Sequence, residues 1–249
     1  VVYVYHSFLL GLWPPQEASL LKTWIVQKNL LQAHIKAYHL INKIYEENRL
    51  GKPFVSIAQN MQDFVPCRAT ARNKFAAFLR AKVFNLDFIS RSFCANALDF
   101  IGVNYYSRSL VELRGWGIKN FSTDVCQGGH DNLKKNSMGW DIYPQGLYHV
   151  LLSLKKYNMP VFILENGICT ADDNLRWEFI REHLEALRKA IEAGVKTLGY
   201  VYWSLLDNYE WDKGFAPRFG LVEVDCSTYK RTIRESAVKF AQVCLSNSL

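Results

Sequence analysis

Residues 160–167 read PVFILENG, and residues 195–203 read VKTLGYVYW. Each stretch is a short apolar run that ends in polar or aromatic residues. Between them, apolar side chains recur every three or four positions from Trp177 to Ile191, which predicts a helix. A buried strand, a helix and another buried strand in succession predict a parallel α/β sheet.

The same alternation extends outward from this centre. Asp172 or Asp173 can cap the start of the central helix, and Gly194 follows its end. Further helices are expected over residues 19–48, 69–92, 144–156 and 231–245, and further strands over residues 53–58, 97–104 and 221–224. A long polar connection is expected over residues 107–137. The predicted fold class is therefore α/β.

Composition excludes several classes of protein. The chain has 249 residues, of which 49% are hydrophobic and 14% aromatic, so it can bury a large core. The net charge of +7 is scattered rather than gathered in basic runs, which argues against a nucleic-acid partner. No apolar run is long enough for a membrane span, and residues 1–15 make a poor signal peptide. The six cysteines form no zinc-type cluster and are too sparse for a disulfide scaffold, so a reducing, cytoplasmic location is expected.

Polar and aromatic side chains collect where the predicted strands end. The carboxyl ends of parallel strands meet at one edge of such a fold, so these side chains are expected to face one cleft. The residues in question are Asn104, Tyr106, Glu165, Trp203, Glu210 and Trp211. Glu165 by itself is also compatible with a structural, hydrogen-bonded carboxylate. Carboxylates beside indole rings suit a pyranose, whose hydroxyls bond to Glu and whose C–H face stacks on Trp.

Four segments resemble glycoside hydrolase family 1, the β-glucosidase family. They are DFIGVNYYS (99–107), MGWDIYPQGL (138–147), VFILENG (161–167) and YWSLLDNYEWDKGFAPRFGLVEVD (202–225). The resemblance implies a (β/α)8 barrel. Only about the second half of that barrel, strands five to eight, is matched, and residues 1–249 are expected to form one domain.

The resemblance implies catalytic roles for two residues. Glu165 corresponds to the nucleophile, and Tyr106 to the tyrosine that hydrogen-bonds it. Asn104 corresponds to a polar residue lining the site beside them. Leu164 stands where the family usually has threonine, a departure that leaves the carboxylate in place.

Other matched residues imply sugar binding. Trp203 corresponds to the platform under the non-reducing-end sugar, and Glu210 with Trp211 to the pair that holds its far hydroxyls. Phe219 corresponds to the aromatic residue that closes this subsite, and Trp140 to a wall on the aglycone side. The Glu210–Trp211 pair favours an unphosphorylated sugar, because a carboxylate would repel a 6-phosphate.

A second catalytic carboxyl is not found. Retaining glycosidases need an acid/base about 5–5.5 Å from the nucleophile, and the family carries it in an Asn-Glu-Pro motif on its fourth strand. The first acidic residue here is Glu17, in a loop without that role. The chain is thus expected to begin just after the acid/base.

The function expected from these residues is retaining hydrolysis of unphosphorylated β-glycosides, very weak or absent in this chain alone. No metal or organic cofactor is implied. The partners expected are a β-glucoside or related glycoside, together with a complementary N-terminal half or a second copy of the chain. The alternatives are a non-catalytic carbohydrate-binding fragment and an assembly unit built on exposed strand edges.

Overall fold

The structure, a computed structural model, describes residues 2–113, 126 and 133–249. The chain divides into two compact units. Unit 1 comprises Val1–Val103 and Ser109–His130, and unit 2 comprises Asn104–Arg108 and Asp131–Leu249. Strand β2 (Ile101–Val111) contributes residues to both.

Unit 1 is mainly helical, with strand β1 next to the ends of β2. Its elements are α1 (Val2–Val4), the π-helical turn η1 (Tyr5–Leu9), α2 (Leu20–Glu47), β1 (Ala58–Pro66), α3 (Ala71–Arg80), the π-helical turn η2 (Ala81–Leu86) and α4 (Asp87–Cys94). The helices expected over residues 19–48 and 69–92 are thus confirmed. Ser19 caps α2 and Thr70 caps α3, because each hydroxyl accepts a hydrogen bond from a backbone N–H three residues later.

The first strand lies later in the chain than the sequence predicts. The strand expected over residues 53–58 is wrong, since β1 begins at Ala58. Gln59, Met61 and Phe64 are its buried side chains. The Gln59 amide is satisfied by the main-chain oxygen of Phe84 at 2.9 Å, which lets a polar residue face the core.

Cys67 and Cys126 form a disulfide in unit 1, with their Cα atoms 5.8 Å apart. Cys67 directly follows β1, and its N–H donates to the main-chain oxygen of Val111 at the end of β2. A disulfide differs from the expectation of reduced cysteines. The other four cysteines, Cys94, Cys169, Cys226 and Cys244, are free.

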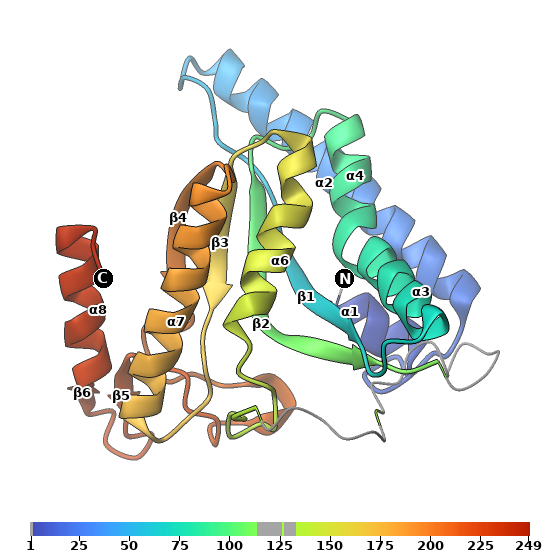
Figure 1. The fold of residues 1–249 in the computed structure, drawn as a ribbon. Coiled ribbons are helices and arrows are strands. Elements are labelled where there is room, and N and C mark those ends of the chain that lie inside the picture. The colour runs from blue at the N-terminus through green and yellow to red at the C-terminus, as the bar shows by residue number, and fades with distance from the viewer. Residues whose placement is uncertain (1, 114–125, 127–132) are drawn as a thin grey trace. The chain divides into compact units, whose positions relative to one another are not determined.

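Unit 2 places the middle of β2, then β3 (Val161–Asn166) and β4 (Thr197–Tyr202), as successive strands of a sheet. Strands β3 and β4 run parallel, with Val161 opposite Thr197 and Ile163 opposite Tyr200. Helices α6 (Pro144–Leu154) and α7 (Asp173–Glu192) pack against each other, and α7 also contacts α8 (Glu235–Ser246) (Figure 1). The parallel α/β arrangement expected from the sequence is therefore present.

Helix α7 agrees closely with its prediction. The Asp172 carboxylate caps it by accepting from the N–H groups of Asn174 and Leu175, and Gly194 follows its end with a φ of +90°. Phe179 and Ile180 on one side of this helix are fully buried.

The last helix is shorter than expected. Residues 231–245 were predicted as one helix, but Arg231–Ile233 form β6, which pairs antiparallel with β5 (Val222–Val224). The remaining elements of unit 2 are the 3-10 turns η3 (Lys155–Tyr157) and η4 (Trp211–Lys213).

The polar connection expected over residues 107–137 begins as strand, because β2 continues to Val111. Residues 114–125 and 127–132 of this connection lie outside the described residues. Among the helices that are described, none combines the length and apolar character needed to cross a membrane.

Candidate active site

Glu165 and Tyr106 meet in unit 2, where the end of β3 lies beside the middle of β2. Glu165 lies near the end of β3, and Tyr106 lies on β2. The Tyr106 hydroxyl donates to Oε2 of Glu165 at 2.6 Å. Burial, and then the charge of Glu165, raise the pKa of Tyr106 far above its ordinary value. Tyr106 therefore stays a neutral donor, and one carboxylate oxygen of Glu165 is held by it.

The end of β3 lies very close to the chain that leaves β4. The N–H of Trp203 donates to the main-chain oxygen of Asn166 at 3.0 Å. A Cβ atom on Gly167 would overlap the carbonyl oxygen of Trp203, so only glycine permits this approach. The glycine of the ENG sequence thus brings Trp203 next to the strand end that carries Glu165.

The ring of Tyr106, whose hydroxyl bonds Glu165, lies in a group of three aromatic rings. The Tyr106 ring lies 6.0 Å from that of Trp140 and 6.3 Å from that of Phe219, and the rings of Trp140 and Phe219 are 6.4 Å apart. Phe219 is buried. The segment with Trp140 is held in place because Arg108 on β2 donates to the Asp141 carboxylate at 2.8 Å. Aromatic pairs at these distances form a rigid wall.

Glu210 brings a second carboxylate into the electrostatic surroundings of Glu165. Burial raises the pKa of Glu210, and the negative charges of Glu165 and Asp212 raise it further. Trp211, the next residue, is 76% exposed, and its φ of +45° is uncommon for a residue with a side chain. The indole ring of Trp211 is thus available to a ligand.

The loop that carries Glu210 is anchored by Asp207, whose role the sequence did not reveal. The Asp207 carboxylate accepts from the N–H of Gly220 at 2.8 Å, from Arg234 at 3.0 Å and from Arg218 at 3.3 Å. Burial alone would raise the pKa of Asp207, but these bonds outweigh it and lower the pKa. In the sequence, Asp207 appeared only as an aspartate that follows the end of a predicted strand. Its hydrogen-bond partners lie further along the chain, so the sequence pattern did not indicate them.

Asn104 is a buried polar residue without a complete set of hydrogen bonds. It is 8% exposed, and its Oδ1 has no partner among the described residues. Buried polar atoms are nearly always paired in native proteins. This buried amide oxygen lies on β2, two residues before Tyr106.

The structure therefore joins most of the predicted site residues. Tyr106, Glu165, Trp140 and Phe219 form one cluster, and the charge of Glu210 acts on it. Trp203 is tied to the cluster through its backbone.

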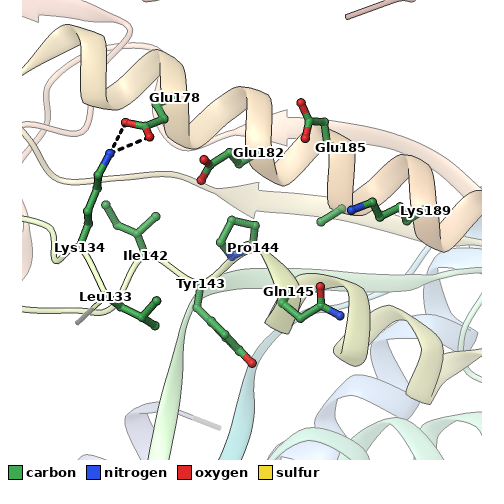
Figure 2. A pocket seen from close by; sticks show the side chains of 11 residues that line it. Leu133, Lys134, Ile142, Tyr143, Pro144, Gln145, Glu178, Glu182, Glu185 and Lys189 are labelled. Atoms are coloured by element: carbon green, nitrogen blue, oxygen red, sulfur yellow. Dashed lines mark hydrogen bonds and ion pairs between the residues drawn. The ribbon is translucent and has the colours of Figure 1, made fainter. Parts of the chain in front are cut away.

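A separate hollow of about 530 Å³ lies on the outer helices of unit 2 and contains none of these residues. Figure 2 shows Glu178, Glu182 and Glu185 along α7, with Lys134 paired to Glu178 at 2.7 Å. Within the described part of the chain, no three His, Cys, Asp or Glu side chains are grouped to hold a metal ion.

Comparison with known proteins gives a consistent picture along the whole chain. The model of the family described as "Glycosyl hydrolase family 1" matches residues 1–96 and 90–249. A β-galactosidase of Sulfolobus acidocaldarius is 32% identical over 98% of this chain, and β-glucosidase A of Thermotoga maritima is 29% identical over 97% of it.

Solved structures agree with the sequence matches. A β-glycosidase from Pyrococcus horikoshii superimposes with a TM-score of 0.85, 37% identity and 97% of this chain covered. A family 1 β-glucosidase from Thermotoga maritima gives a TM-score of 0.85 at 28% identity, with all of this chain covered. The predicted fold class, α/β and part of a (β/α)8 barrel, is confirmed.

The chain spans about half the length of the relatives that it matches. It covers 52% of the Sulfolobus protein and 60% of the Thermotoga protein. It likewise covers 58% and 62% of the two solved structures.

Proposed function

Because the chain belongs to glycosyl hydrolase family 1, we propose that it is part of a β-glycosidase that hydrolyses unphosphorylated β-glycosides with retention of configuration. The relatives are named β-galactosidase and β-glucosidase, so a gluco- or galacto-configured sugar is the proposed substrate. The hydrogen bond between Tyr106 and Glu165 is the observation that supports this proposal most directly.

The proposed reaction has two steps. An oxygen of the Glu165 carboxylate attacks the anomeric carbon while the glycosidic C–O bond breaks, and a general acid protonates the leaving oxygen. Water then attacks the anomeric carbon, gives a proton back to the acid/base, and releases Glu165. Tyr106 holds one oxygen of Glu165, which leaves the other free to attack.

The general acid is proposed to lie in a part of the barrel that this chain does not contain, or in a second chain. The Sulfolobus relative is nearly twice as long as the chain, which leaves room for such a segment. Hydrolysis by this chain alone is accordingly expected to be very weak, because the leaving group departs without a proton donor.

The proposed sugar subsite combines aromatic faces and carboxylate. Trp203 serves as the platform, and Glu210 and Trp211 hold the far hydroxyls. Phe219 closes this subsite. Raised pKa and partial burial make Glu210 a strong acceptor for sugar hydroxyls, and its charge disfavours a 6-phosphate.

Two further contacts complete the proposed site. Asn104 lies on β2 two residues before Tyr106, and we assign it to the polar lining beside that residue. Trp140 lines the aglycone side, next to Tyr106.

Hydrolysis of a nitrophenyl β-glucoside tests this proposal, because an activated leaving group needs little help from an acid. Weak turnover that disappears in Glu165→Gln and persists in Glu223→Gln, an exposed control on β5, would support it. A 2-deoxy-2-fluoroglucoside with a dinitrophenolate leaving group should add one sugar mass at Glu165. Turnover that is unchanged by Glu165→Gln would refute the assignment.

A carbohydrate-binding role without catalysis is the second candidate. It would use the same proposed sugar contacts, all of which lie in unit 2. Calorimetric titration of Glu165→Gln with glucose or cellobiose separates the two, since binding without any turnover in the unmodified chain would favour this role.

The cytoplasm remains the location predicted from the sequence. The Cys67–Cys126 disulfide favours an oxidising compartment instead. Mass measurement after alkylation of the freshly isolated protein, with and without reduction, distinguishes the two, because a reduced pair takes up alkyl groups without prior reduction.

A further inference from the structure

Asn166 follows Glu165 in the chain and is completely buried. Its Nδ2 donates to the main-chain oxygen of Tyr105 at 2.7 Å, and its Oδ1 accepts from the Tyr200 hydroxyl at 2.8 Å. Its main-chain oxygen accepts from the N–H of Trp203 at 3.0 Å. One side chain thus connects β3 to β2 and to β4.

The orientation of this amide is fixed by its partners. The carbonyl oxygen of Tyr105 can only accept, so it must face the NH2 group of Asn166. Tyr200 is partly buried, and its hydroxyl donates to Oδ1 of Asn166. An aspartate at position 166 would have the same shape but no donor for Tyr105.

The amide closes a ring of covalent and hydrogen bonds around the catalytic pair. Tyr105 and Tyr106 are consecutive on β2, and Glu165 and Asn166 are consecutive on β3. The Tyr106 hydroxyl joins Glu165, while the Asn166 amide joins the peptide group that precedes Tyr106. Residues 105–106 and residues 165–166 are therefore joined by two hydrogen bonds. Strand β3 cannot slide along β2 without breaking one of them.

We infer that Asn166 is a positioning residue that sets the contact between Tyr106 and Glu165. The inference rests on the proposed function for its catalytic consequence, because Glu165 is there the nucleophile. Its geometric part, a shorter and more ordered Tyr106–Glu165 bond, holds whether or not the chain hydrolyses a glycoside.

The test compares four variants of this chain. Asn166→Ala removes the amide, and Asn166→Asp keeps its shape but removes the donor. Tyr200→Phe removes the other partner and leaves the bond to Tyr105. Ser236→Ala is the control, since it deletes the 2.6 Å hydrogen bond from the buried Ser236 to Asp173 elsewhere in unit 2.

Two readouts are used. The first is the hydroxyl proton of Tyr106 in the NMR spectrum, assigned by its loss in Tyr106→Phe. The second is the rate at which the 2-deoxy-2-fluoroglucoside labels Glu165. We expect Asn166→Ala and Asn166→Asp to shift or lose the hydroxyl signal and to slow labelling about 10–100-fold. Tyr200→Phe and Ser236→Ala should stay close to the unmodified chain.

The outcomes separate this inference from the proposed function. Labelling of the unmodified chain with no change in either Asn166 variant would overturn the inference and leave the function standing. Absence of labelling in the unmodified chain would count against the function, and the hydroxyl signal would still decide the inference. An equal change in Ser236→Ala would mean a general loss of stability and would overturn the positioning role.

A measurement on the unmodified chain covers the case in which the Asn166 variants do not fold. The side-chain amide proton of Asn166 that is bonded to Tyr105 should exchange with solvent far more slowly than that of the exposed Asn247. Equal exchange rates would overturn the inference.

Discussion

Gly167 shows how closely the end of β3 approaches the chain after β4. No left-handed backbone explains this glycine, since its φ is not positive. Glycine is required at this position for steric reasons, because the carbonyl group of Trp203 occupies the place of a Cβ atom. The glycine therefore serves the junction between the strands that carry Glu165 and Trp203.

Gly167→Ala is expected to lower the free energy of unfolding by about 1–3 kcal/mol, because a backbone carbonyl must move to admit the methyl group. Labelling of Glu165 should fall with it. Gly199→Ala is the matched control, since its methyl group would meet only the edge of the Phe162 ring, at 3.1 Å, and that ring can turn. Urea unfolding of both variants is the measurement, and a smaller loss for Gly167→Ala than for Gly199→Ala would contradict the explanation.

His183 predicts a specific dependence of stability on pH. Burial lowers the pKa of His183 from 6.5 to about 3, against the opposing effect of its bond to the Phe179 oxygen. Its Nε2 has no partner among the described residues. Below pH 6.5 this histidine binds a proton in the unfolded chain but stays neutral in the folded chain. The contribution of neutral His183 to the free energy of unfolding is therefore present above pH 6.5 and is lost as the pH falls toward 3.

His183→Phe keeps the stack on Phe179, whose ring centroid is 3.8 Å away, and removes this titration. Between pH 7 and pH 5 the unmodified chain should lose about 2 kcal/mol of unfolding free energy more than the variant does. Urea unfolding of both proteins at both pH values measures this difference. The contributions of all other titrating groups cancel, because the two proteins share them. Equal losses in the two proteins would show that His183 is not buried in its neutral form.

For single residues, the sequence predicted which side chains meet, but it did not predict the residues that hold them in place. Glu165 and Tyr106 belong to motifs that can be read in order along the chain, and they do meet. Asn166 and Asp207 act through partners on other strands and loops, which no local pattern reveals. Their importance follows from burial and hydrogen bonding, which only tertiary structure supplies.

Among the elements, the loop between β4 and β5 depends on one buried ionic cluster. Asp207 is only 3% exposed at its side chain, and Arg234 only 10%. Glu210 lies on the same loop, so the cluster connects stability to the proposed sugar subsite.

Asp207→Asn is expected to lower the unfolding free energy by about 2–4 kcal/mol at neutral pH, because Arg234 is left buried beside a neutral amide. The lowered pKa of Asp207 means that this contribution is present above the ordinary aspartate range and is lost as the pH falls below it. Asp212→Asn, whose side chain is 57% exposed, should change stability little. Thermal unfolding at pH 7 compares them, and equal shifts would count against the cluster.

Elements were predicted well where apolar residues recur every three or four positions, as in α2 and α7. They were predicted poorly where polar residues form the strand through hydrogen bonds to other parts of the chain. Strand β1 was misplaced because Gln59, a polar residue, faces the core with its amide hydrogen-bonded. The strand therefore lacks a regular alternation of apolar and polar residues in its sequence. Strand β6 was assigned to a helix because its three residues are exposed and form a strand only by pairing with β5. Such pairing is a tertiary effect that outweighs local pattern.

For the whole molecule, sequence motifs predicted the family and the barrel type, which the relatives confirm. The assignment of residues 1–249 to one domain stays a prediction. Sequence motifs identify a family, whereas the division into units 1 and 2 follows from tertiary contacts that no motif encodes.

The apolar side chains of β4 predict that this chain associates with another. Leu198 and Val201 are 50% and 45% exposed on this strand. Exposed strands with such side chains readily pair with other chains.

Val201→Lys should therefore raise the fraction of monomer in sedimentation velocity runs. Leu245→Lys, at an 88% exposed position near the end of α8, should not. A monodisperse monomer of the unmodified chain over a wide concentration range would contradict this prediction.

The bond between Cys67 and Cys126 closes a covalent loop with a sequence separation of 59 residues. A single protease cut anywhere inside that loop would leave both pieces attached to one another. The nicked molecule would migrate as one band on a denaturing gel and split into two only after a thiol reagent is added. A single band on a non-reducing gel therefore does not show that the backbone of this protein is uncut.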